Sequence, residues 1–136
     1  MYNSVPVKDV PLFYPKDVYP DHEAALIAGI RSTTTGSDTV VIVGGGKGSS
    51  SVVAARQVGS NGSVITYEGA RNSLQSTKRT LKLNGITNVD LHHAIVGADI
   101  HLFGEAGRAN HISGDELPES NVLVLDCEGA EKEILK

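Results

Sequence analysis

A run of β-branched residues that leads directly into a glycine-rich turn constrains this chain more than any other feature. Residues 39–43 read Thr-Val-Val-Ile-Val, and residues 44–48 read Gly-Gly-Gly-Lys-Gly. A short continuous run of this kind predicts a strand buried on both faces, as in the centre of a parallel sheet. The serine-rich segment 49–58 predicts a helix that its serines can cap. We therefore expect an α/β protein built on a strand–turn–helix unit.

The rest of the chain repeats this alternation of strands and helices. Strands that alternate with helices across short loops form right-handed crossovers and a parallel sheet. The glycine-punctuated segment 97–120 is expected to be a loop. The expected elements are a helix from Asp21, as its cap, to about Arg31, further strands over 63–67, 88–94 and 121–126, and helices over 70–84 and from Gly129 onward.

Length and charge narrow the function classes. The 136 residues suffice for one domain, which we place at 21–136 after a proline-rich, extended leader over 1–20. A net charge of −4 gives no basic footprint for nucleic acid and no polybasic patch for a membrane. Because no apolar run approaches the roughly 20 residues of a spanning helix, and residues 1–10 lack the apolar core of a signal peptide, we expect a cytoplasmic protein.

Neither a disulfide nor a metal site is expected. Cys127 is the single cysteine, so it has no partner within the chain. His92 and His93 are adjacent on a predicted strand and should point to opposite faces, which prevents joint ligation of a metal.

The glycine turn admits three interpretations as a ligand site. A phosphate-binding P-loop is excluded, because Val41 stands where its first glycine is needed and Gly48 replaces the Ser or Thr that binds magnesium. The dinucleotide pattern Gly-x-Gly-x-x-Gly is weakened by Ser49. The pattern Gly-x-Gly-x-Gly is satisfied by Gly44, Gly46 and Gly48.

An acidic residue follows at the end of the next predicted strand. Glu68 lies 24 positions after Gly44 (68 − 44), where a carboxylate can accept both hydrogens of a ribose diol. An exposed strand end would keep this carboxylate ionised. The pair fits an adenosyl ligand without a pyrophosphate. The alternative is that the glycines only permit a tight turn and that Glu68 is solvated.

Three stretches together resemble the FkbM family of class I S-adenosylmethionine-dependent methyltransferases. They are Val-Ile-Val-Gly-Gly-Gly-Lys-Gly at 41–48, Val-Ile-Thr-Tyr-Glu-Gly-Ala at 64–70 and Leu-Val-Leu-Asp-Cys-Glu-Gly-Ala-Glu at 123–131. The third is the most specific. Leu83-Asn84-Gly85-Ile86, with Ala94-Ile95 further on, is also similar to the family, so the resemblance covers 39–136.

The resemblance implies a Rossmann-like, three-layer αβα fold with a mostly parallel sheet. It also implies S-adenosylmethionine as methyl donor and O-methyl transfer to a small or carbohydrate-like acceptor. Carried over by position, the cofactor-binding residues would be Gly44, Gly45, Gly46, Gly48, Glu68, Ala94 and Ile95. Glu68 would bind the ribose, and Ala94 with Ile95 the adenine edge. Asp126 and Glu128 would border the transferred methyl group as catalytic residues.

Two residues depart from the family pattern, and so does the number of strands. Ile42 stands where the family has an acid, and Gly69 where it has a proline. About four strands are expected here against the family's seven, which indicates a truncated form. The open edge of the fourth strand then needs a cover, and a homo-oligomer could supply it.

The candidate bases have plainer alternatives, and so does the function. Asp126 can be a solvated strand-end carboxylate, and Glu128 an acid that favours the dipole of the next helix. Lys47 in the glycine turn could meet the donor's carboxylate or simply reach solvent. Three functions compete: a methyltransferase-like domain that binds S-adenosylmethionine, a catalytically silent module for assembly or donor binding, and an NAD(P)-binding oxidoreductase domain.

Overall fold

The computed structural model describes residues 5–6, 21–97, 105–127 and 129–136. No helix in these segments is long and apolar enough to cross a lipid bilayer. The elements are α1 (Ala24–Thr33), β1 (Thr39–Val43), α2 (Ser49–Val58), η2 (Gly59–Asn61), β2 (Ser63–Glu68), α3 (Arg71–Leu83), β3 (Val89–Val96), β4 (Asn110–Ile112), η3 (Gly114–Glu116), β5 (Val122–Leu125) and α4 (Glu131–Ile134).

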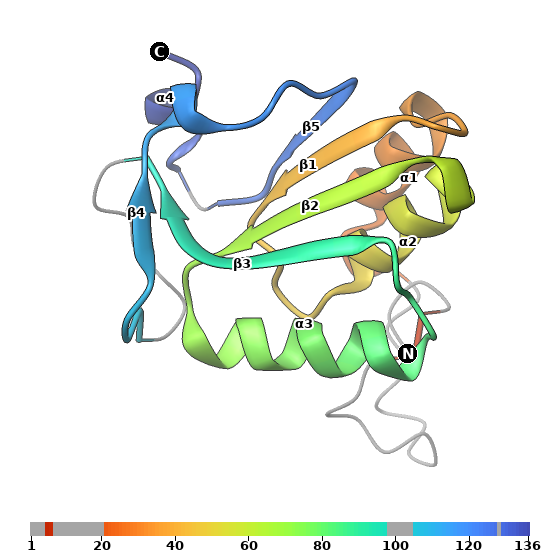
Figure 1. Ribbon diagram of the computed structural model, residues 1–136, viewed down its shortest axis with the longest axis horizontal. Helices are drawn as coiled ribbons and strands as arrows, with labels where there is room; N and C mark the ends of the chain where they lie inside the picture. The colour runs from red at the N-terminus through yellow and green to blue at the C-terminus, as the bar shows by residue number, and fades with distance from the viewer. Residues whose placement is uncertain (1–4, 7–20, 98–104, 128) are drawn as a thin grey trace.

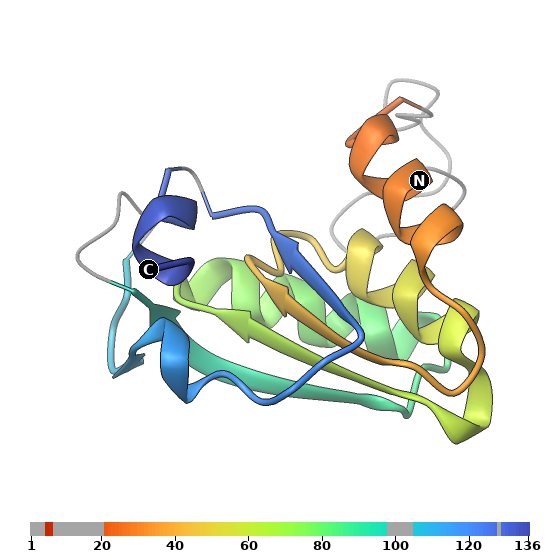
Figure 2. The same ribbon diagram turned by 90° about the horizontal axis from the view of Figure 1, so that it is seen from above.

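One sheet of five parallel strands organises the molecule, in the order β4-β3-β2-β1-β5. β1 lies between β2 and β5, which pair with it in parallel register. Both views place α1 and α4 at opposite ends of the molecule, with the carboxyl ends of the strands toward α4 (Figures 1 and 2). The predicted Rossmann-like α/β fold is confirmed.

Both faces of β1 are buried, as its β-branched sequence predicts. Val40 and Ile42 belong to a core with side chains of α1, α2 and α3, whereas Val41 and Val43 belong to a second core that includes Ile134 of α4. Successive side chains of a strand point to opposite faces, so the two cores lie on opposite sides of the sheet. This gives the three-layer arrangement, in which the described part of the chain places the short α4 helix on the second face.

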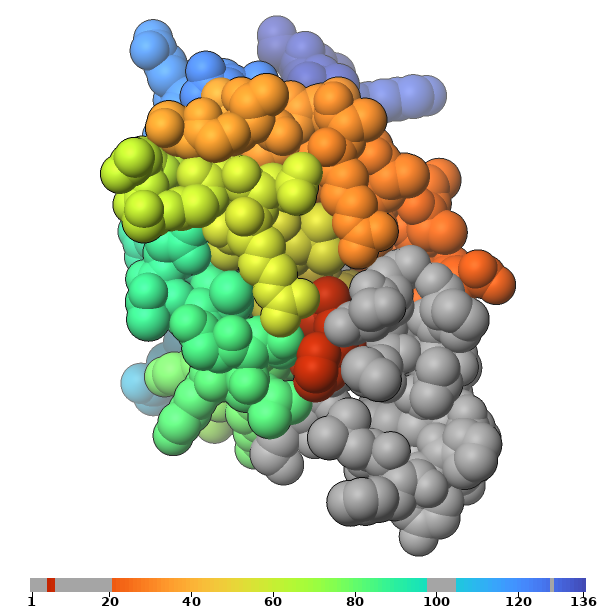
Figure 3. Space-filling view, turned by 90° about the vertical axis from the view of Figure 1, so that its right-hand side faces the viewer, coloured from red at the N-terminus to blue at the C-terminus, as the bar shows by residue number. Residues whose placement is uncertain are grey.

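The first described residues belong to the core. Val5 is 1% exposed and packs in the cluster that contains Ile27 and Val52. The Pro6 carbonyl accepts a hydrogen bond of 2.8 Å from Nδ2 of Asn84. In Figure 3, this short red segment lies against the green and yellow-green surface of the helices and strands. The extended conformation expected for the rest of the leader falls outside the described residues.

The predicted helix caps are wrong, although the helices form where expected. α1 begins at Ala24, after Glu23 in a left-handed conformation with φ 52°, so Asp21 does not cap it. α2 is preceded by Gly48 without a side-chain cap, and its first serines are buried. Ser51 instead hydrogen-bonds to Thr66 of β2 across 2.9 Å. The Ser51 hydroxyl is therefore used in packing against the sheet rather than in capping.

The segment expected to be a loop contains a strand. β4 pairs with the end of β3, with Ala94 opposite Asn110 and Val96 opposite Ile112. This fifth strand extends the four that were expected, and β3 runs on to Val96 to meet it. Because three residues carry no periodic pattern and their pairing uses backbone groups, the sequence gives no signal for such a strand. Residues 98–104 of this segment lie outside the described residues.

Replacement of Ile42 by alanine tests the central position of β1. Ile42 is fully buried, so Ile42→Ala should lower the free energy of unfolding by about 2 to 4 kcal/mol in urea denaturation. Leu123→Ala on the adjacent strand β5 is the control, because Leu123 is 41% exposed and should cost about 1 kcal/mol or less. Equal losses for the two variants would contradict the assignment of β1 as the buried centre.

Candidate functional site

A cavity of about 320 Å³ lies at the carboxyl ends of the strands. This is where open parallel sheets bind ligands, and the volume is at the lower end of small-molecule sites. The cavity brings together six of the predicted residues, which come from the ends of four strands: Gly44, Gly46, Glu68, Ala94, Ile95 and Asp126. Gly45 and Gly48 are not among its lining residues, and Glu128 lies outside the described part of the chain.

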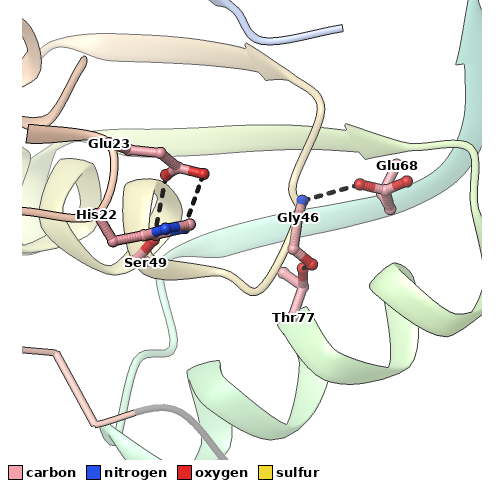
Figure 4. Close-up of polar contacts among 6 residues, drawn as sticks. All are labelled: His22, Glu23, Gly46, Ser49, Glu68 and Thr77. Carbon is pink, nitrogen blue, oxygen red and sulfur yellow. Dashed lines mark hydrogen bonds and ion pairs between the residues drawn. The ribbon is translucent and has the colours of Figure 1, made fainter. Parts of the chain in front are cut away.

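The Glu68 carboxylate holds the glycine turn together. Its Oε2 accepts hydrogen bonds from the backbone N–H groups of Gly45 and Gly46, each 2.9 Å long, and its Oε1 accepts one of 2.7 Å from Ala70. Figure 4 shows the carboxylate directed at the turn, with its bond to Gly46. The expectation of an exposed strand end is wrong, since Glu68 is only 7% exposed.

These three bonds limit what else Glu68 can accept. Each carboxylate oxygen offers two lone pairs. The two N–H groups at Oε2 use both of its lone pairs, and Ala70 uses one at Oε1. In this arrangement Glu68 has room for one further hydrogen bond, whereas the sequence predicted that it would accept both hydrogens of a diol.

The N–H groups of the glycines in the turn all donate within the protein. Besides the two that bond to Glu68, Gly44 donates to the Tyr67 carbonyl at 2.9 Å and Gly48 donates to the Gly45 carbonyl at 2.8 Å. An anion at Gly45 or Gly46 would have to displace a carboxylate and would be repelled by it. The turn is therefore poorly suited to a phosphate or a pyrophosphate.

Two glycines of the turn serve different needs. A Cβ at Gly44, whose φ is 96°, would lie 2.0 Å from the Asp126 carbonyl oxygen, so glycine is required for close approach of protein backbone. A Cβ at Gly46 would meet nothing within 4 Å, so this residue borders open space on the cavity side. The Gly46 carbonyl accepts a 3.1 Å hydrogen bond from Thr77 Oγ1, which ties the turn to α3 (Figure 4).

The walls near β3 are apolar. Ala94, Ile95 and Val96 are each at most 6% exposed and line the cavity beside Val43. Ile42, which stands where the family that the sequence resembles has an acid, is in the core between β1 and the helices and is not a lining residue. A carboxylate on that side chain would be buried without water, so its absence fits the packing of this chain.

The titratable groups after β5 differ in their readiness to lose a proton. Partial loss of solvent and repulsion by Glu131 raise the pKa of Asp126, and the charge of His22 opposes this rise. Burial, with smaller effects from Glu131, raises the pKa of the Cys127 thiol to about 12. Cys127 is thus a neutral wall residue at physiological pH rather than a nucleophile.

Several wall residues were not predicted from the sequence. His22 and Glu23 reach the cavity from the start of α1, and Ser73 reaches it from the first turn of α3. His22 has no partner at a recognisable spacing in the sequence, so only the packing of α1 beside α2 reveals its place. Tyr67 also lines the cavity, and its position directly before Glu68 on the same predicted strand is a sequence feature from which this could have been inferred.

Comparison with known proteins finds methyltransferases among the solved structures that share this fold. A precorrin-6y C5,15-methyltransferase from Geobacter metallireducens superposes with a TM-score of 0.59 at 20% identity, over 87% of this chain and 54% of that protein. A protein-L-isoaspartate O-methyltransferase superposes with a TM-score of 0.50 at 23% identity, over 79% of this chain and 29% of that protein. The YcgJ protein from Bacillus subtilis superposes with a TM-score of 0.52 at 13% identity, over 76% of this chain and 38% of that protein.

These likenesses establish the fold of the chain. The chain spans between 29% and 54% of the length of the three proteins. No protein-family model matches its sequence, and no curated protein matches it either.

Removal of the Glu68 carboxylate should destabilise the fold. Glu68→Ala leaves three N–H groups without their acceptor, and we expect it to lower the free energy of unfolding by about 3 kcal/mol or more in urea denaturation. Glu68→Gln keeps one oxygen as an acceptor for the turn, so it should lower the free energy of unfolding by less than Glu68→Ala. The exposed Glu119→Ala is the control and should stay within about 0.5 kcal/mol of the unchanged protein. A Glu68→Ala variant as stable as this control would refute the three-bond arrangement.

Proposed function

We propose that this chain is a methyltransferase domain that binds S-adenosylmethionine at the carboxyl ends of β1, β2 and β3. The observation that carries the proposal is the placement of Glu68 on the amides of Gly45 and Gly46. That placement disfavours a pyrophosphate next to the turn, yet it leaves one acceptor position for a sugar hydroxyl. An adenosyl ligand without phosphate meets both conditions.

The cavity residues fit such a donor. Glu68 accepts one ribose hydroxyl, while the apolar surface of Ala94 and Ile95 packs on the adenine. Gly46 borders open space, so the ammonium group of the methionine end, which Glu68 attracts, can approach the backbone closely there. The bound donor supplies a methyl group on a sulfonium, and the protein aligns it with an acceptor for in-line displacement.

The narrower parts of the proposal rest on the sequence alone. They are membership of the FkbM family, O-methyl transfer to a small or carbohydrate-like acceptor, a domain at 21–136 and a cytoplasmic location. Asp126 and Glu128 are retained as candidate catalytic residues, and Gly45 and Gly48 contribute through the shape of the turn. Among the structural neighbours, one is named as a protein-L-isoaspartate O-methyltransferase and one as a precorrin-6y C5,15-methyltransferase.

One observation favours a second candidate, the catalytically silent module. The N–H groups of Gly44, Gly45, Gly46 and Gly48 are satisfied inside the protein, so the turn needs no ligand to complete its hydrogen bonds. The NAD(P)-binding alternative is the weakest of the three, because Glu68 stands where the pyrophosphate would approach.

A second copy of the chain is the proposed cover for the outer edge of β5. Among the described residues no strand pairs with that edge, and Leu123 on β5 is 41% exposed. Uncovered edges promote pairing between chains. Sedimentation velocity decides this part of the proposal, and a monomer at all concentrations would argue against it.

Titration calorimetry tests the main proposal. We expect saturable binding of S-adenosylmethionine and S-adenosylhomocysteine and no binding of NAD⁺. Ser73→Trp should abolish the binding, because residue 73 lines the cavity and an indole would fill the space. The matched control is Asn72→Trp, which changes an exposed neighbour outside the lining and should bind like the unchanged protein.

The three functions give different outcomes in this experiment. Binding of NAD⁺ alone would overturn the methyltransferase proposal. Binding of none of the three ligands would favour the silent module. Equal loss of binding in the two tryptophan variants would show that the ligand lies elsewhere.

The single open acceptor position of Glu68 predicts an unequal response to the two ribose hydroxyls. Versions of S-adenosylhomocysteine that lack either the 2′ or the 3′ hydroxyl should differ in affinity. One should lose about tenfold or more, as for a hydrogen bond to a charged acceptor, and the other should stay within about threefold. Equal large losses for both analogues would indicate that Glu68 leaves the turn and grips the diol with both oxygens.

A further inference from the structure

A second carboxylate lies on the wall of the proposed donor cavity, across the glycine turn from Glu68. Glu23 directly precedes α1 and lines the cavity together with Gly46. Figure 4 shows Glu23 and Glu68 on opposite sides of Gly46. The donor site as proposed above gives Glu23 no part of the ligand to bind.

The Glu23 carboxylate has capacity for further hydrogen bonds. In the described part of the chain its Oε1 lies 3.1 Å from Nε2 of His22, and its Oε2 accepts a 3.4 Å hydrogen bond from Ser49 Oγ. A carboxylate offers about four lone-pair positions, so these two contacts leave about two for a ligand. The side chain is 27% exposed, so a ligand can reach it and the protein avoids the full cost of burying its charge.

The backbone at Glu23 is in an unfavourable conformation that the helix does not need. Its φ of 52° and ψ of 33° are left-handed values, which residues with a Cβ adopt only at an energetic cost. The Glu23 side chain makes no capping hydrogen bond to α1. It contacts Ser49 instead, the first residue of α2 after the glycine turn. This conformation therefore places a negative charge beside the turn rather than stabilising the end of α1.

We propose that Glu23 binds the α-ammonium group at the methionine end of S-adenosylmethionine. This inference rests on the proposed function, which assigns the adenine to the end of β3, the ribose to Glu68 at the end of β2, and the methionine end to the open space at Gly46. β1 is the next strand of the sheet after β2, so the donor follows the order of the strands. Beyond Gly46, on the side away from Glu68, the carboxylate that meets an ammonium group is Glu23 (Figure 4).

The other charged groups of the cavity are engaged elsewhere. Three backbone N–H groups and one ribose hydroxyl fill the acceptor positions of Glu68, so it attracts the ammonium group only from a distance. Asp126 follows β5 and is the candidate for the transferred methyl group and the acceptor. Lys47 lines the cavity from the turn, and its positive charge attracts the carboxylate group of the same methionine end.

Titration calorimetry with two ligands that differ only in the amino group tests the proposal. S-adenosylhomocysteine carries the α-ammonium group, and its deaminated analogue has a hydrogen in that place. We expect the unchanged protein to bind S-adenosylhomocysteine about tenfold more tightly than the analogue, as for a hydrogen bond between charged groups. Glu23→Gln removes the charge and keeps the shape, so the ratio of the two affinities should fall to about threefold or less.

A matched variant and a shorter ligand serve as controls. Asp21→Asn removes a charge from an exposed residue that does not line the cavity, and it should keep the ratio of the unchanged protein. 5′-Methylthioadenosine, which lacks the methionine end, should bind equally well to the unchanged protein and to Glu23→Gln. An equal loss of affinity for all three ligands would mean that Glu23 only shapes the cavity, and it would overturn the proposal. A ratio that falls in Asp126→Asn and not in Glu23→Gln would do the same.

Glu23→Gly separates the stability of the fold from the binding of the donor. Glycine adopts the left-handed conformation without steric cost, so this variant should not unfold at a lower urea concentration than the unchanged protein. It lacks the carboxylate, so it should lose the preference for S-adenosylhomocysteine over the deaminated analogue. A clear loss of stability, or an unchanged preference, would contradict the role of Glu23 in binding the ammonium group.

Failure of this inference can be told from failure of the proposed function. If no adenosyl ligand binds, the proposed function falls, and this inference falls with it. If the adenosyl ligands bind with the same ratio in the unchanged protein and in Glu23→Gln, the donor site stands and Glu23 does not bind the ammonium group.

Discussion

The buried carboxylate of Glu68 is the interaction on which the rest of the site depends. A carboxylate at 7% exposure needs hydrogen-bond donors, and it finds three in the backbone around it. These bonds connect the end of β2 to the turn after β1 and to the start of α3. One side chain thereby fixes the relative positions of three elements, and the cavity lies where they meet.

The same interaction determines which ligands suit the site. Glycines after a buried strand are compatible with several nucleotide sites, because they only allow close approach. Here a fixed negative charge lies on the amides that an anionic ligand would use. The proposed preference for a nucleoside over a dinucleotide rests on this fixed charge.

Much of the fold could be predicted from the sequence, because its strands carry strong patterns. The run Thr39–Val43 forms β1 with the expected bounds, and α2 spans the expected 49–58. β4 could not be found, since its three residues are specified by pairing with β3 rather than by their own side chains. Capping was mispredicted at the serines of α2, because tertiary contacts with Glu23 and Thr66 use the hydroxyls of Ser49 and Ser51. Asp21 is exposed and does not cap α1.

The site was predictable in its location but less so in its bonding. The glycines and Glu68 come together as their positions at strand ends imply, whereas the direction of the Glu68 carboxylate depends on a turn geometry that residue types do not encode. The presence of His22 and Glu23 at the cavity could not be predicted from the sequence, for another reason. They arrive from the start of α1, and only the contact between α1 and α2 brings them to the cavity.

The contact between Gly44 and Asp126 has a consequence for how this chain can vary. Because the carbonyl of Asp126 occupies the place of a β-carbon at residue 44, any larger residue there would push the exit of β5 away from β1. Such a shift would move the Asp126 side chain and widen the gap between the glycine turn and the cavity wall after β5. The absence of a β-carbon at Gly44 thus sets the spacing between the turn after β1 and the residues that follow β5.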